Sequence, residues 1–266
     1  MARFRASPSD GVVWITGASS GIGRAVALEL ARRDFVVAAT GRQRSMLDTL
    51  TEEGAKLPGR IVAFEGDVTD GPGMAALVER IARDLGPLSL AFLNAGTFFT
   101  AARAGFDAEA FERTFEVNVL GIGYCLEPVV AGMSTRRCGQ IVLNASLAGY
   151  GGLPGSAAYG PSKAAVIHLA EALTFDLHDR NITVQVVCPG YVKTPLTDRN
   201  NFDMPLLMDV DEAARRICDG IAQGGFEIAF PRRLSWLLKV INMLPYPAYF
   251  ALLRRSIGTR NRSSGV

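Results

Sequence analysis

The sequence predicts an α/β fold built on a doubly wound parallel sheet with helices on both of its faces. Short apolar segments rich in β-branched residues alternate with segments of helical periodicity along most of the 266 residues. The apolar segments are not broken by regularly spaced polar residues, which is typical of parallel strands covered on both faces. A glycine-rich turn directly follows the first apolar segment. Such sheets bind ligands beyond the carboxyl ends of their strands, so we expect functional motifs there.

The expected elements follow one another in a regular order. We expect strands at Val12–Thr16, 35–40, 60–66, 88–94, 139–146, 182–188 and 226–230. We expect helices at 22–34, 45–53, 72–85, 108–133, 159–179 and 211–222. Neither a low-complexity linker nor a repeat interrupts the alternation. Residues 1–230 are therefore expected to form a single Rossmann-like domain, with residues 231–266 as a C-terminal extension.

The composition limits the classes of function. Hydrophobic residues make up 48% of the chain and charged residues 20%, which is enough apolar surface for a sizeable core. The net charge of +2 argues against a nucleic-acid partner. The start of the chain lacks the apolar run of a signal peptide, and four scattered cysteines without a C-x-x-C pair favour a cytoplasmic protein with reduced thiols. The two histidines, His168 and His178, lie in no metal-ligand pattern, so we expect no metal site.

The turn TGASSGIG, from Thr16 to Gly23, has the features of a phosphate-binding loop. Its glycines allow the backbone to approach a pyrophosphate closely, and the following helix offers unpaired N–H groups and the positive end of its dipole. A glycine-rich turn without function is the alternative, and the flanking strand and helix argue against it. No Lys-Ser or Lys-Thr pair follows the last glycine, which argues against an NTPase. The residues expected to contact a cofactor here are Gly17, Ser19, Ser20, Gly21, Ile22 and Gly23.

Arg42 indicates which dinucleotide the loop binds. A site for NAD(H) usually carries an acidic residue at the end of the second strand, where it holds the ribose hydroxyls. This chain has Gly41 and then Arg42, and an arginine can pair with a 2′-phosphate in a bidentate way. We therefore expect NADP(H) as the cofactor. The alternative is that Arg42 is a solvated loop charge, and Arg44 is a weaker candidate for the same phosphate.

The pentapeptide YGPSK places a tyrosine and a lysine four residues apart, at Tyr159 and Lys163. In a helix these positions lie on the same face, so the phenol and the ammonium point the same way. The pair is either an acid–base element or two surface residues, and the pentapeptide alone does not decide between them.

Taken together, the motifs resemble those of the short-chain dehydrogenase/reductase family, in its compact single-domain branch. The resemblance extends to about Pro231, and its motifs occur in the order of the family at the expected strand ends. Leu93 replaces the first asparagine of the family's N-N-A-G motif, a departure that we expect to affect packing more than chemistry. The matching segments are TGASSGIG, GDV at 66–68, LNAG at 93–96, VNVLG, NASLAG, YGPSK and PGYVKT at 189–194.

The resemblance implies a set of functional residues. Tyr159 would serve as general acid and base, and the Lys163 ammonium would lower the pKa of its phenol and contact the nicotinamide ribose. Ser146 would hydrogen-bond the substrate oxygen, and Asn118 would help to hold a water that relays protons from the lysine. The catalytic residues are thus expected to be Asn118, Ser146, Tyr159 and Lys163. Further cofactor contacts are expected at Asp67, Val68, Asn94, Ala95, Gly96, Tyr159, Lys163, Pro189, Gly190, Val192 and Thr194.

Three segments are expected to surround the substrate: residues 97–106, residues 147–157 and a lid at about 191–208. Their apolar side chains favour a small lipophilic ketone, aldehyde or secondary alcohol as substrate, unless they only pack the lid. The side chains in question are Phe98, Phe99, Tyr150, Leu153, Leu206 and Leu207.

The C-terminal extension differs in charge from the rest of the chain. Residues 231–266 contain six arginines, one lysine and no acidic residue, which gives this segment +7 and leaves −5 for the remainder. Pro245 and Pro247 argue against a membrane-spanning helix and favour two short amphipathic helices. Residues 232–255 are expected either to attach peripherally to the inner face of an anionic membrane or to pack over the substrate pocket or a subunit interface. The family resemblance implies a homodimer or a homotetramer.

Two other classes of function stay open at this point. A protein that senses NADP(H) without catalysis should lack part of the set of serine, tyrosine and lysine, and this chain keeps all three. A membrane-associated interaction protein would use the extension and would not need Tyr159.

Overall fold

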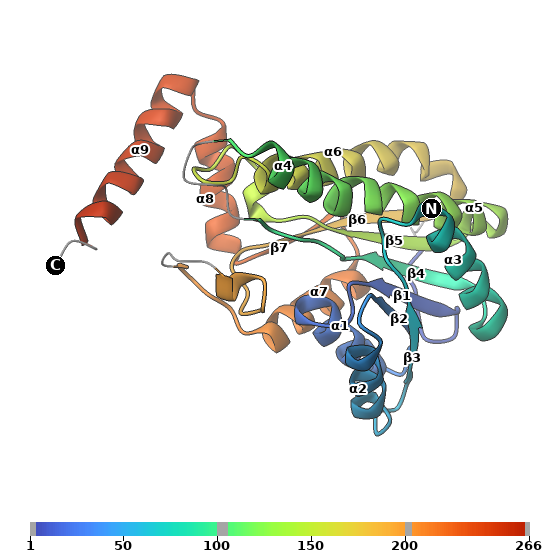
Figure 1. The fold of residues 1–266 in the computed structure, drawn as a ribbon. Coiled ribbons are helices and arrows are strands. Elements are labelled where there is room, and N and C mark those ends of the chain that lie inside the picture. The colour runs from blue at the N-terminus through green and yellow to red at the C-terminus, as the bar shows by residue number, and fades with distance from the viewer. Residues whose placement is uncertain (1–3, 100–105, 200–203, 264–266) are drawn as a thin grey trace.

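The computed structural model describes residues 4–99, 106–199 and 204–263, without the side chains of 199 and 255–263. Its centre is a parallel sheet with the strand order β3-β2-β1-β4-β5-β6-β7 (Figure 1). This order confirms the predicted doubly wound α/β sheet. The strands are β1 (Val12–Thr16), β2 (Val36–Gly41), β3 (Arg60–Glu65), β4 (Leu88–Leu93), β5 (Gly139–Asn144), β6 (Ile182–Pro189) and β7 (Glu227–Phe230).

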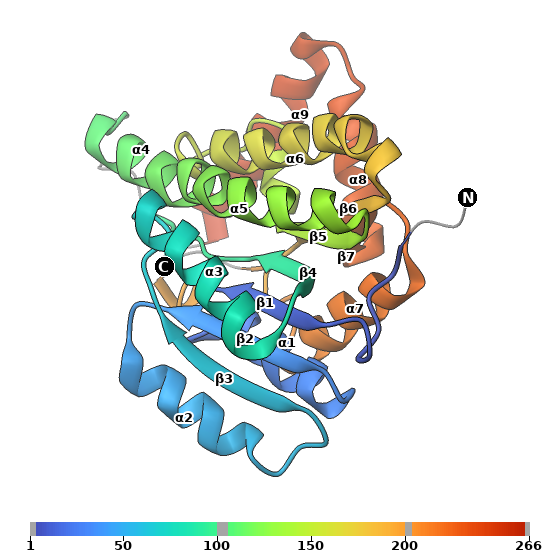
Figure 2. The same cartoon turned by 90° about the vertical axis from the view of Figure 1, so that its right-hand side faces the viewer.

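Helices cover both faces of the sheet and create two separate cores (Figures 1 and 2). One face is covered by α1 (Gly21–Arg32), α2 (Arg44–Gly54) and α7 (Val210–Gln223). The other is covered by α3 (Gly71–Leu85), α5 (Gly121–Arg136) and α6 (Tyr159–Asp176). Successive residues of a strand serve opposite cores, as Val13 and Trp14 of β1 do. This two-sided burial is why the strands read as continuous apolar runs.

The strand order of the sheet changes direction at β1 and β4. From β1 the sheet extends through β2 to β3, and the chain then returns to place β4 on the other side of β1. Connections that leave β1 and β4 therefore diverge at the carboxyl edge of the sheet, where doubly wound folds form their binding crevice.

The helix predicted over 108–133 is interrupted in the structure. It consists of α4 (Ala108–Phe115), a π-helical turn at Glu116–Leu120 and α5, which continues to Arg136. The wider turn lies where Asn118 is fully buried and hydrogen-bonded to segments outside the helix. Apolar periodicity does not reveal a π-helical turn, because such a turn adds a residue to the helix and leaves its amphipathic face in place.

Other predicted boundaries shift by a few residues. The strand predicted over 139–146 ends at Asn144, because the Ser146 hydroxyl accepts a hydrogen bond from Ala148 N at 3.1 Å and starts a short 3₁₀ turn, Leu147–Gly149. The helix predicted to reach residue 179 ends at Asp176 and is followed by a 3₁₀ turn, His178–Arg180.

Within the described residues, one helical stretch, Ala108–Arg136, is long and apolar enough to cross a bilayer by length and composition alone. Of its most apolar window, 39% is buried inside the protein. Buried residues of this stretch, among them Ile122 and Val129, belong to the core beneath α3 and α6. We therefore assign Ala108–Arg136 to the layer of helices that covers this face of the sheet together with α3 and α6.

The C-terminal extension forms α8 (Arg232–Asn242) and α9 (Tyr246–Ser263). Pro247 lies in the first turn of α9, where the missing N–H of proline costs little. Lys239 of α8 pairs with Glu227 at the start of β7. The Tyr249 hydroxyl donates a hydrogen bond of 2.7 Å to the backbone oxygen of Gly152. The extension thus contacts both the last strand and the loop that follows Ser146.

Candidate active site

The glycine loop packs tightly against the end of β4. Gly17 has φ +67°, and a Cβ at this position would lie 2.8 Å from the Cα of Ala95. A Cβ on Gly23 would lie 2.4 Å from the backbone oxygen of Gly17. These contacts require glycine at both positions, and they bring the first turn of α1 to the carboxyl edge of the sheet.

The start of α1 has the chemistry that a pyrophosphate needs. Ser20 precedes the helix without capping it through its side chain, so the first N–H groups have no side-chain acceptor there. A Cβ on Gly21 would lie 3.3 Å from Cγ2 of Thr194, so the segment after β6 lies directly above the loop. An uncapped helix N-terminus beneath a narrow glycine cradle fits the diphosphate of a dinucleotide.

Arg42 and Asp67 meet beside this loop. Ser19 lies against Gly41 at the end of β2, which places Arg42 next to the loop. The Arg42 guanidinium is exposed, and its Nη1 lies 3.8 Å from Oδ2 of Asp67. Oδ1 of Asp67 accepts hydrogen bonds of 3.0 Å from the N–H and the hydroxyl of Thr69. Arg44 instead pairs with Asp48 within α2 at 2.8 Å.

Asn94 fastens the glycine loop to the neighbouring strands. Its Nδ2 donates to the backbone oxygens of Thr16 at 3.0 Å and Gly17 at 3.3 Å. Its Oδ1 accepts a hydrogen bond of 2.9 Å from Nδ2 of Asn144. The Thr16 hydroxyl in turn accepts from the N–H groups of Asn94 and Ala95, at 3.0 and 3.1 Å. The ends of β1, β4 and β5 are therefore joined by one network.

Asn118 joins the segment after β4 to α6. Its Oδ1 accepts from Thr97 N at 2.7 Å, and its Nδ2 donates to the backbone oxygen of Thr97 and to Oγ of Ser162, both at 3.0 Å. A Cβ on Gly96 would lie 3.4 Å from both Asn118 Oδ1 and Lys163 Nζ. Both amide hydrogens of Asn118 are thus used in positioning its neighbours, and its part in a proton relay stays a prediction.

Lys163 is buried beneath the predicted catalytic tyrosine. Its Nζ donates a hydrogen bond of 2.7 Å to the backbone oxygen of Asn144 and lies 5.7 Å from the centre of the Tyr159 ring. Ser146 lies near enough to the Tyr159 hydroxyl to lower the pKa of this phenol. Phe98 packs edge-on against the Tyr159 ring at 5.4 Å between ring centres. The structure therefore brings Ser146, Tyr159 and Lys163 together.

The pKa values of this pair are set mainly by burial. Burial disfavours the ammonium and lowers the pKa of Lys163 to about 8. Loss of water raises the pKa of Tyr159 to about 12, and Ser146 opposes this rise only in part. The pKa of Tyr159 thus lies above its ordinary value rather than below it, because burial dominates. Lys163 is not among the groups that shift this pKa, so its expected effect on the phenol stays a prediction.

The segment after β6 closes the site from above. Ser146 Oγ lies 3.4 Å from the backbone oxygen of Pro189, and Gly190 N donates to the backbone oxygen of Phe230 at 2.7 Å. Val192 forms a parallel bridge with Met208, which fixes the two ends of the predicted lid side by side. Residues 200–203 of the lid lie outside the described residues.

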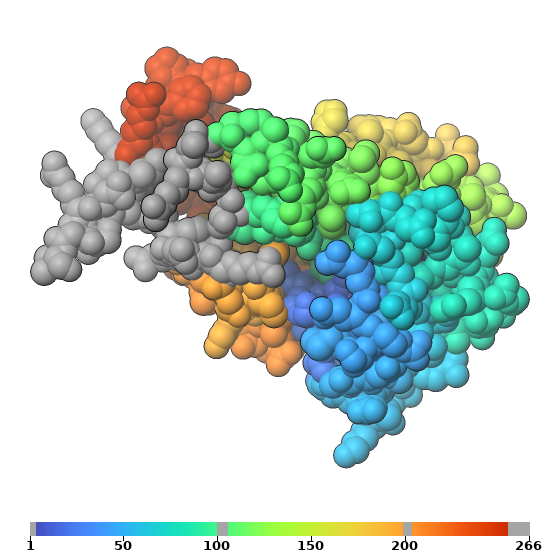
Figure 3. Space-filling model, viewed as in Figure 1, coloured from blue at the N-terminus to red at the C-terminus, as the bar shows by residue number. Residues whose placement is uncertain are grey.

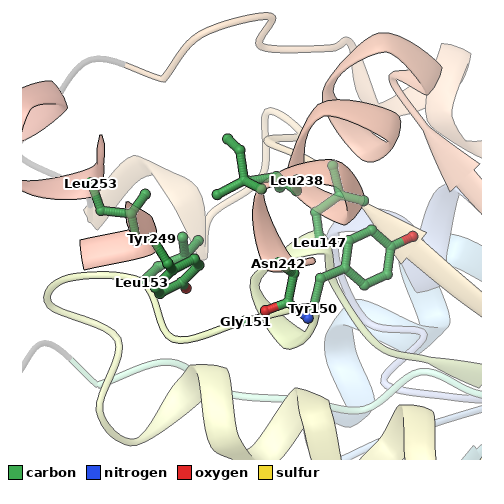
Figure 4. A pocket seen from close by; sticks show the side chains of 9 residues that line it. Leu147, Tyr150, Gly151, Leu153, Leu238, Asn242, Tyr249 and Leu253 are labelled. Carbon is green, nitrogen blue, oxygen red and sulfur yellow. The ribbon is translucent and has the colours of Figure 1, made fainter. Parts of the chain in front are cut away.

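Two shallow apolar pockets flank the loop between Ser146 and Tyr159. One is lined by Phe99, Phe106, Asp107, Ala110, Gly155, Ala157, Ala158 and Tyr159. The other lies under the extension and is lined by Leu147, Tyr150, Gly151, Leu153, Leu238, Ile241, Asn242, Tyr249 and Leu253 (Figure 4). The predicted Phe99, Tyr150 and Leu153 line these pockets, whereas Leu206 and Leu207 are exposed and line neither. Residues 100–105 of the first predicted pocket segment lie outside the described residues.

Asn144 and Ser162 are site residues that the sequence analysis missed. Asn144 supports Lys163 through its backbone oxygen and Asn94 through its side chain. A signal was present, because an asparagine ends an otherwise apolar strand two residues before Ser146. Ser162 lies inside YGPSK and bonds Asn118, a contact that no sequence spacing indicates. No cluster of three potential metal ligands occurs among the described residues.

Comparison with known proteins identifies the family. The family model described as short chain dehydrogenase matches residues 11–204. An uncharacterized oxidoreductase from Myxococcus xanthus is 36% identical over 241 residues, which cover 91% of this chain and 95% of that protein. A short-chain dehydrogenase from Sphingobium yanoikuyae in complex with NADPH has a TM-score of 0.76 and 25% identity, covering 96% of both chains. NAD⁺-bound xylitol dehydrogenase has a TM-score of 0.74 and 27% identity, covering 83% of this chain and 97% of that one. The chain is therefore a member of the short-chain dehydrogenase/reductase family of oxidoreductases.

Proposed function

We propose that this oxidoreductase uses NADP(H) to interconvert a lipophilic ketone or aldehyde and the corresponding alcohol. The observation that carries the proposal is the cluster of Ser146, Tyr159 and Lys163 at the carboxyl edge of the sheet, beside an uncapped glycine loop. A hydroxyl pair next to a buried ammonium is suited to moving one proton to or from a substrate oxygen.

The bound nicotinamide would supply the hydride in reduction and accept it in oxidation. In reduction, the Ser146 hydroxyl orients the carbonyl oxygen and the Tyr159 hydroxyl donates the proton that this oxygen needs. The buried Lys163 ammonium stabilises the tyrosinate that remains, because an opposite charge nearby favours the ionised phenol. In oxidation the same atoms carry the proton in the opposite direction.

Arg42 supports NADP(H) over NAD(H). Its guanidinium lies at the end of β2, next to the glycine loop, and its only ion-pair partner among the described residues is Asp67 at 3.8 Å. So long a contact at an exposed site is weak, which leaves the guanidinium free to bind a phosphate. The similar protein from Sphingobium yanoikuyae was solved with NADPH, and the similar xylitol dehydrogenase with NAD⁺.

The pocket beside Tyr159 supports a lipophilic substrate. Phe99 and Phe106 form its aromatic side, and alanines form much of the rest. Asp107 is the only charged residue in its lining among the described residues, and its side chain already caps α4 by accepting from Ala110 N at 3.0 Å. Such a surface gains free energy by covering an apolar group.

The experiment is a steady-state assay of NADPH and NADH consumption with purified protein. The substrates are aldehydes and ketones of increasing alkyl length, with polyhydroxylated carbonyl compounds of similar size as controls. We expect turnover with NADPH that rises with alkyl length and little turnover of the polar compounds. Tight NADPH binding without turnover of any compound would contradict the proposal and favour a cofactor-sensing protein.

A further inference from the structure

Helix α8 exposes an apolar face. Its large apolar side chains at positions 236, 237 and 240, and those at 243 and 244 directly after the helix, follow helical spacing. Trp236 is 68% exposed, Val240 56% and Met243 84%. Core-facing helices turn such a stripe inward, so an exposed stripe of this width indicates a surface that is covered in use.

The opposite face of α8 is already occupied by the domain. Ser235 is buried, and its Oγ lies 3.3 Å from the Tyr150 hydroxyl. Leu238 and Ile241 line the pocket above the loop that follows Ser146 (Figure 4). The exposed apolar stripe is therefore not the face by which α8 packs on the domain, because the face with Ser235, Leu238 and Ile241 does so.

Helix α9 extends the apolar surface with aromatic side chains. Tyr246 and Phe250, one turn apart, stack at 5.8 Å between ring centres and are 76% and 49% exposed. Tyr249, between them, points inward and is buried. The two helices lie at one end of the molecule, where α9 stands away from the sheet (Figure 1). The described part of α9, in red, protrudes at that end in the space-filling view (Figure 3).

The charge around this surface has one sign. Arg232, Arg233 and Arg254 are exposed, and none of them forms an ion pair with any residue that the structure describes. Residues 231–266 contain no acidic residue and carry +7, whereas the rest of the chain carries −5. The basic charge is thus concentrated where the apolar side chains are exposed.

We propose that α8 and α9 bind the surface of an anionic membrane, such as the leaflet that faces the cytoplasm. The apolar and aromatic side chains would enter the boundary between headgroups and acyl chains, and the arginines would contact lipid phosphates. A second copy of the chain is a poorer occupant, because two such surfaces would bring arginines of the same sign together. A lipid surface complements both the apolar character and the charge.

Tryptophan fluorescence provides a direct test. The chain has two tryptophans, and Trp14 is fully buried, so only Trp236 can respond to a new surface. The protein is titrated with vesicles of phosphatidylcholine alone and with vesicles containing about one third phosphatidylserine. We expect a blue shift and co-sedimentation with the anionic vesicles that weaken as salt rises, and no shift in Trp236→Phe.

Matched substitutions distinguish vesicle binding through this surface from non-specific binding of the protein to vesicles. Leu237→Glu with Met243→Glu should weaken binding to anionic vesicles by at least about tenfold, because each places a carboxylate against the lipid phosphates. Phe175→Glu is the control, because Phe175 is 81% exposed on α6 outside this surface, and it should bind within about twofold of wild type.

Two results would overturn the proposal. One is vesicle binding that Leu237→Glu with Met243→Glu leaves unchanged. The other is failure of the wild-type protein to bind anionic vesicles. A dimer of the wild type that the same double substitution dissociates would in that case assign the surface to a second copy of the chain.

Discussion

The buried ammonium of Lys163 and the side chain of Asn94 are joined through a single residue, Asn144. Lys163 Nζ donates to the backbone oxygen of Asn144 at 2.7 Å, and Nδ2 of Asn144 donates to Asn94 Oδ1 at 2.9 Å. Asn94 in turn holds the backbone oxygens of Thr16 and Gly17. The lysine and the glycine loop therefore share one support at the ends of β4 and β5.

Replacing Asn144 should loosen the glycine loop more than it destabilises the fold. In Asn144→Leu, Asn94 loses a hydrogen bond, and we expect NADPH affinity to fall by about tenfold. The substitution also removes Asn144 Oδ1, a buried atom without a hydrogen-bond partner in the described structure, so the free energy of unfolding should fall by less than about 2 kcal/mol. Fluorescence titration and urea unfolding measure the two quantities. Thr135→Val, which removes an exposed hydroxyl bonded to the Ala131 backbone oxygen, is the control, and equal affinities in both variants would refute this role.

The pKa of Lys163 predicts how stability depends on pH. The pKa of Lys163 is about 8 in the folded protein and about 10.5 in the unfolded chain, so between these values the unfolded state binds more protons. The free energy of unfolding of the wild type, relative to Lys163→Met, should therefore rise by on the order of 2 kcal/mol from pH 7.5 to about 9.5. Urea unfolding at both pH values measures this difference. A difference that does not change with pH would show that the lysine keeps its ordinary pKa.

Arg42 should discriminate between the two nicotinamide cofactors. In Arg42→Ala the 2′-phosphate loses its cation, and we expect the Kd for NADPH to rise by about tenfold while that for NADH changes by less than about twofold. Isothermal titration calorimetry with both cofactors measures this. Arg44→Ala is the matched control, because Arg44 is bonded to Asp48 and should leave both values near those of wild type. Equal losses of affinity for NADPH and NADH in Arg42→Ala would mean that this arginine does not bind the 2′-phosphate.

The strand–helix alternation and the glycine loop were predictable because they depend on local patterns. The apolar runs around Val13 and Phe92 are continuous because both faces of the sheet are covered. The spacing of Tyr159 and Lys163 predicted a shared helix face, and both lie in α6. In both cases the pattern in the sequence predicts the environment that the residues have in the structure.

The remaining features arise from contacts between distant segments. The π-helical turn around Asn118 depends on bonds to Thr97 and Ser162, which no periodicity indicates. The raised pKa of Tyr159 depends on how much water the surrounding segments remove, which the sequence does not state. The apolar residues of α8 could be recognised, but which of them face outward depends on the contacts of Ser235 and Leu238 with the domain.

Glu227 should hold α8 on the domain. Its carboxylate accepts a hydrogen bond of 2.6 Å from the Tyr150 hydroxyl and pairs with Lys239. Burial, followed by the neighbouring Cys188 and the hydrogen bond to Glu227, raises the pKa of Tyr150, so its hydroxyl stays a donor at neutral pH. In Glu227→Ala we expect amide hydrogen exchange across α8 to accelerate by at least about tenfold.

Hydrogen exchange with mass spectrometry measures this change. Glu212→Ala is the control, because Glu212 pairs with Arg215 and Arg216 on the exposed side of α7 and should leave α8 unchanged. Unaltered exchange of α8 in Glu227→Ala would mean that apolar contacts alone hold the helix.

The most direct test of the proposed chemistry is the single-turnover rate of carbonyl reduction with NADPH bound, compared between wild type and Tyr159→Phe. The rate should fall by at least about a hundredfold, because the substrate oxygen loses its proton donor, while the Kd for NADPH should change by less than about threefold. Tyr150→Phe, which removes a tyrosine hydroxyl that is bonded to Glu227 and lies beside Ser235, should keep most of the rate. A Tyr159→Phe variant that reduces the substrate at the wild-type rate would show that Tyr159 is not the proton donor.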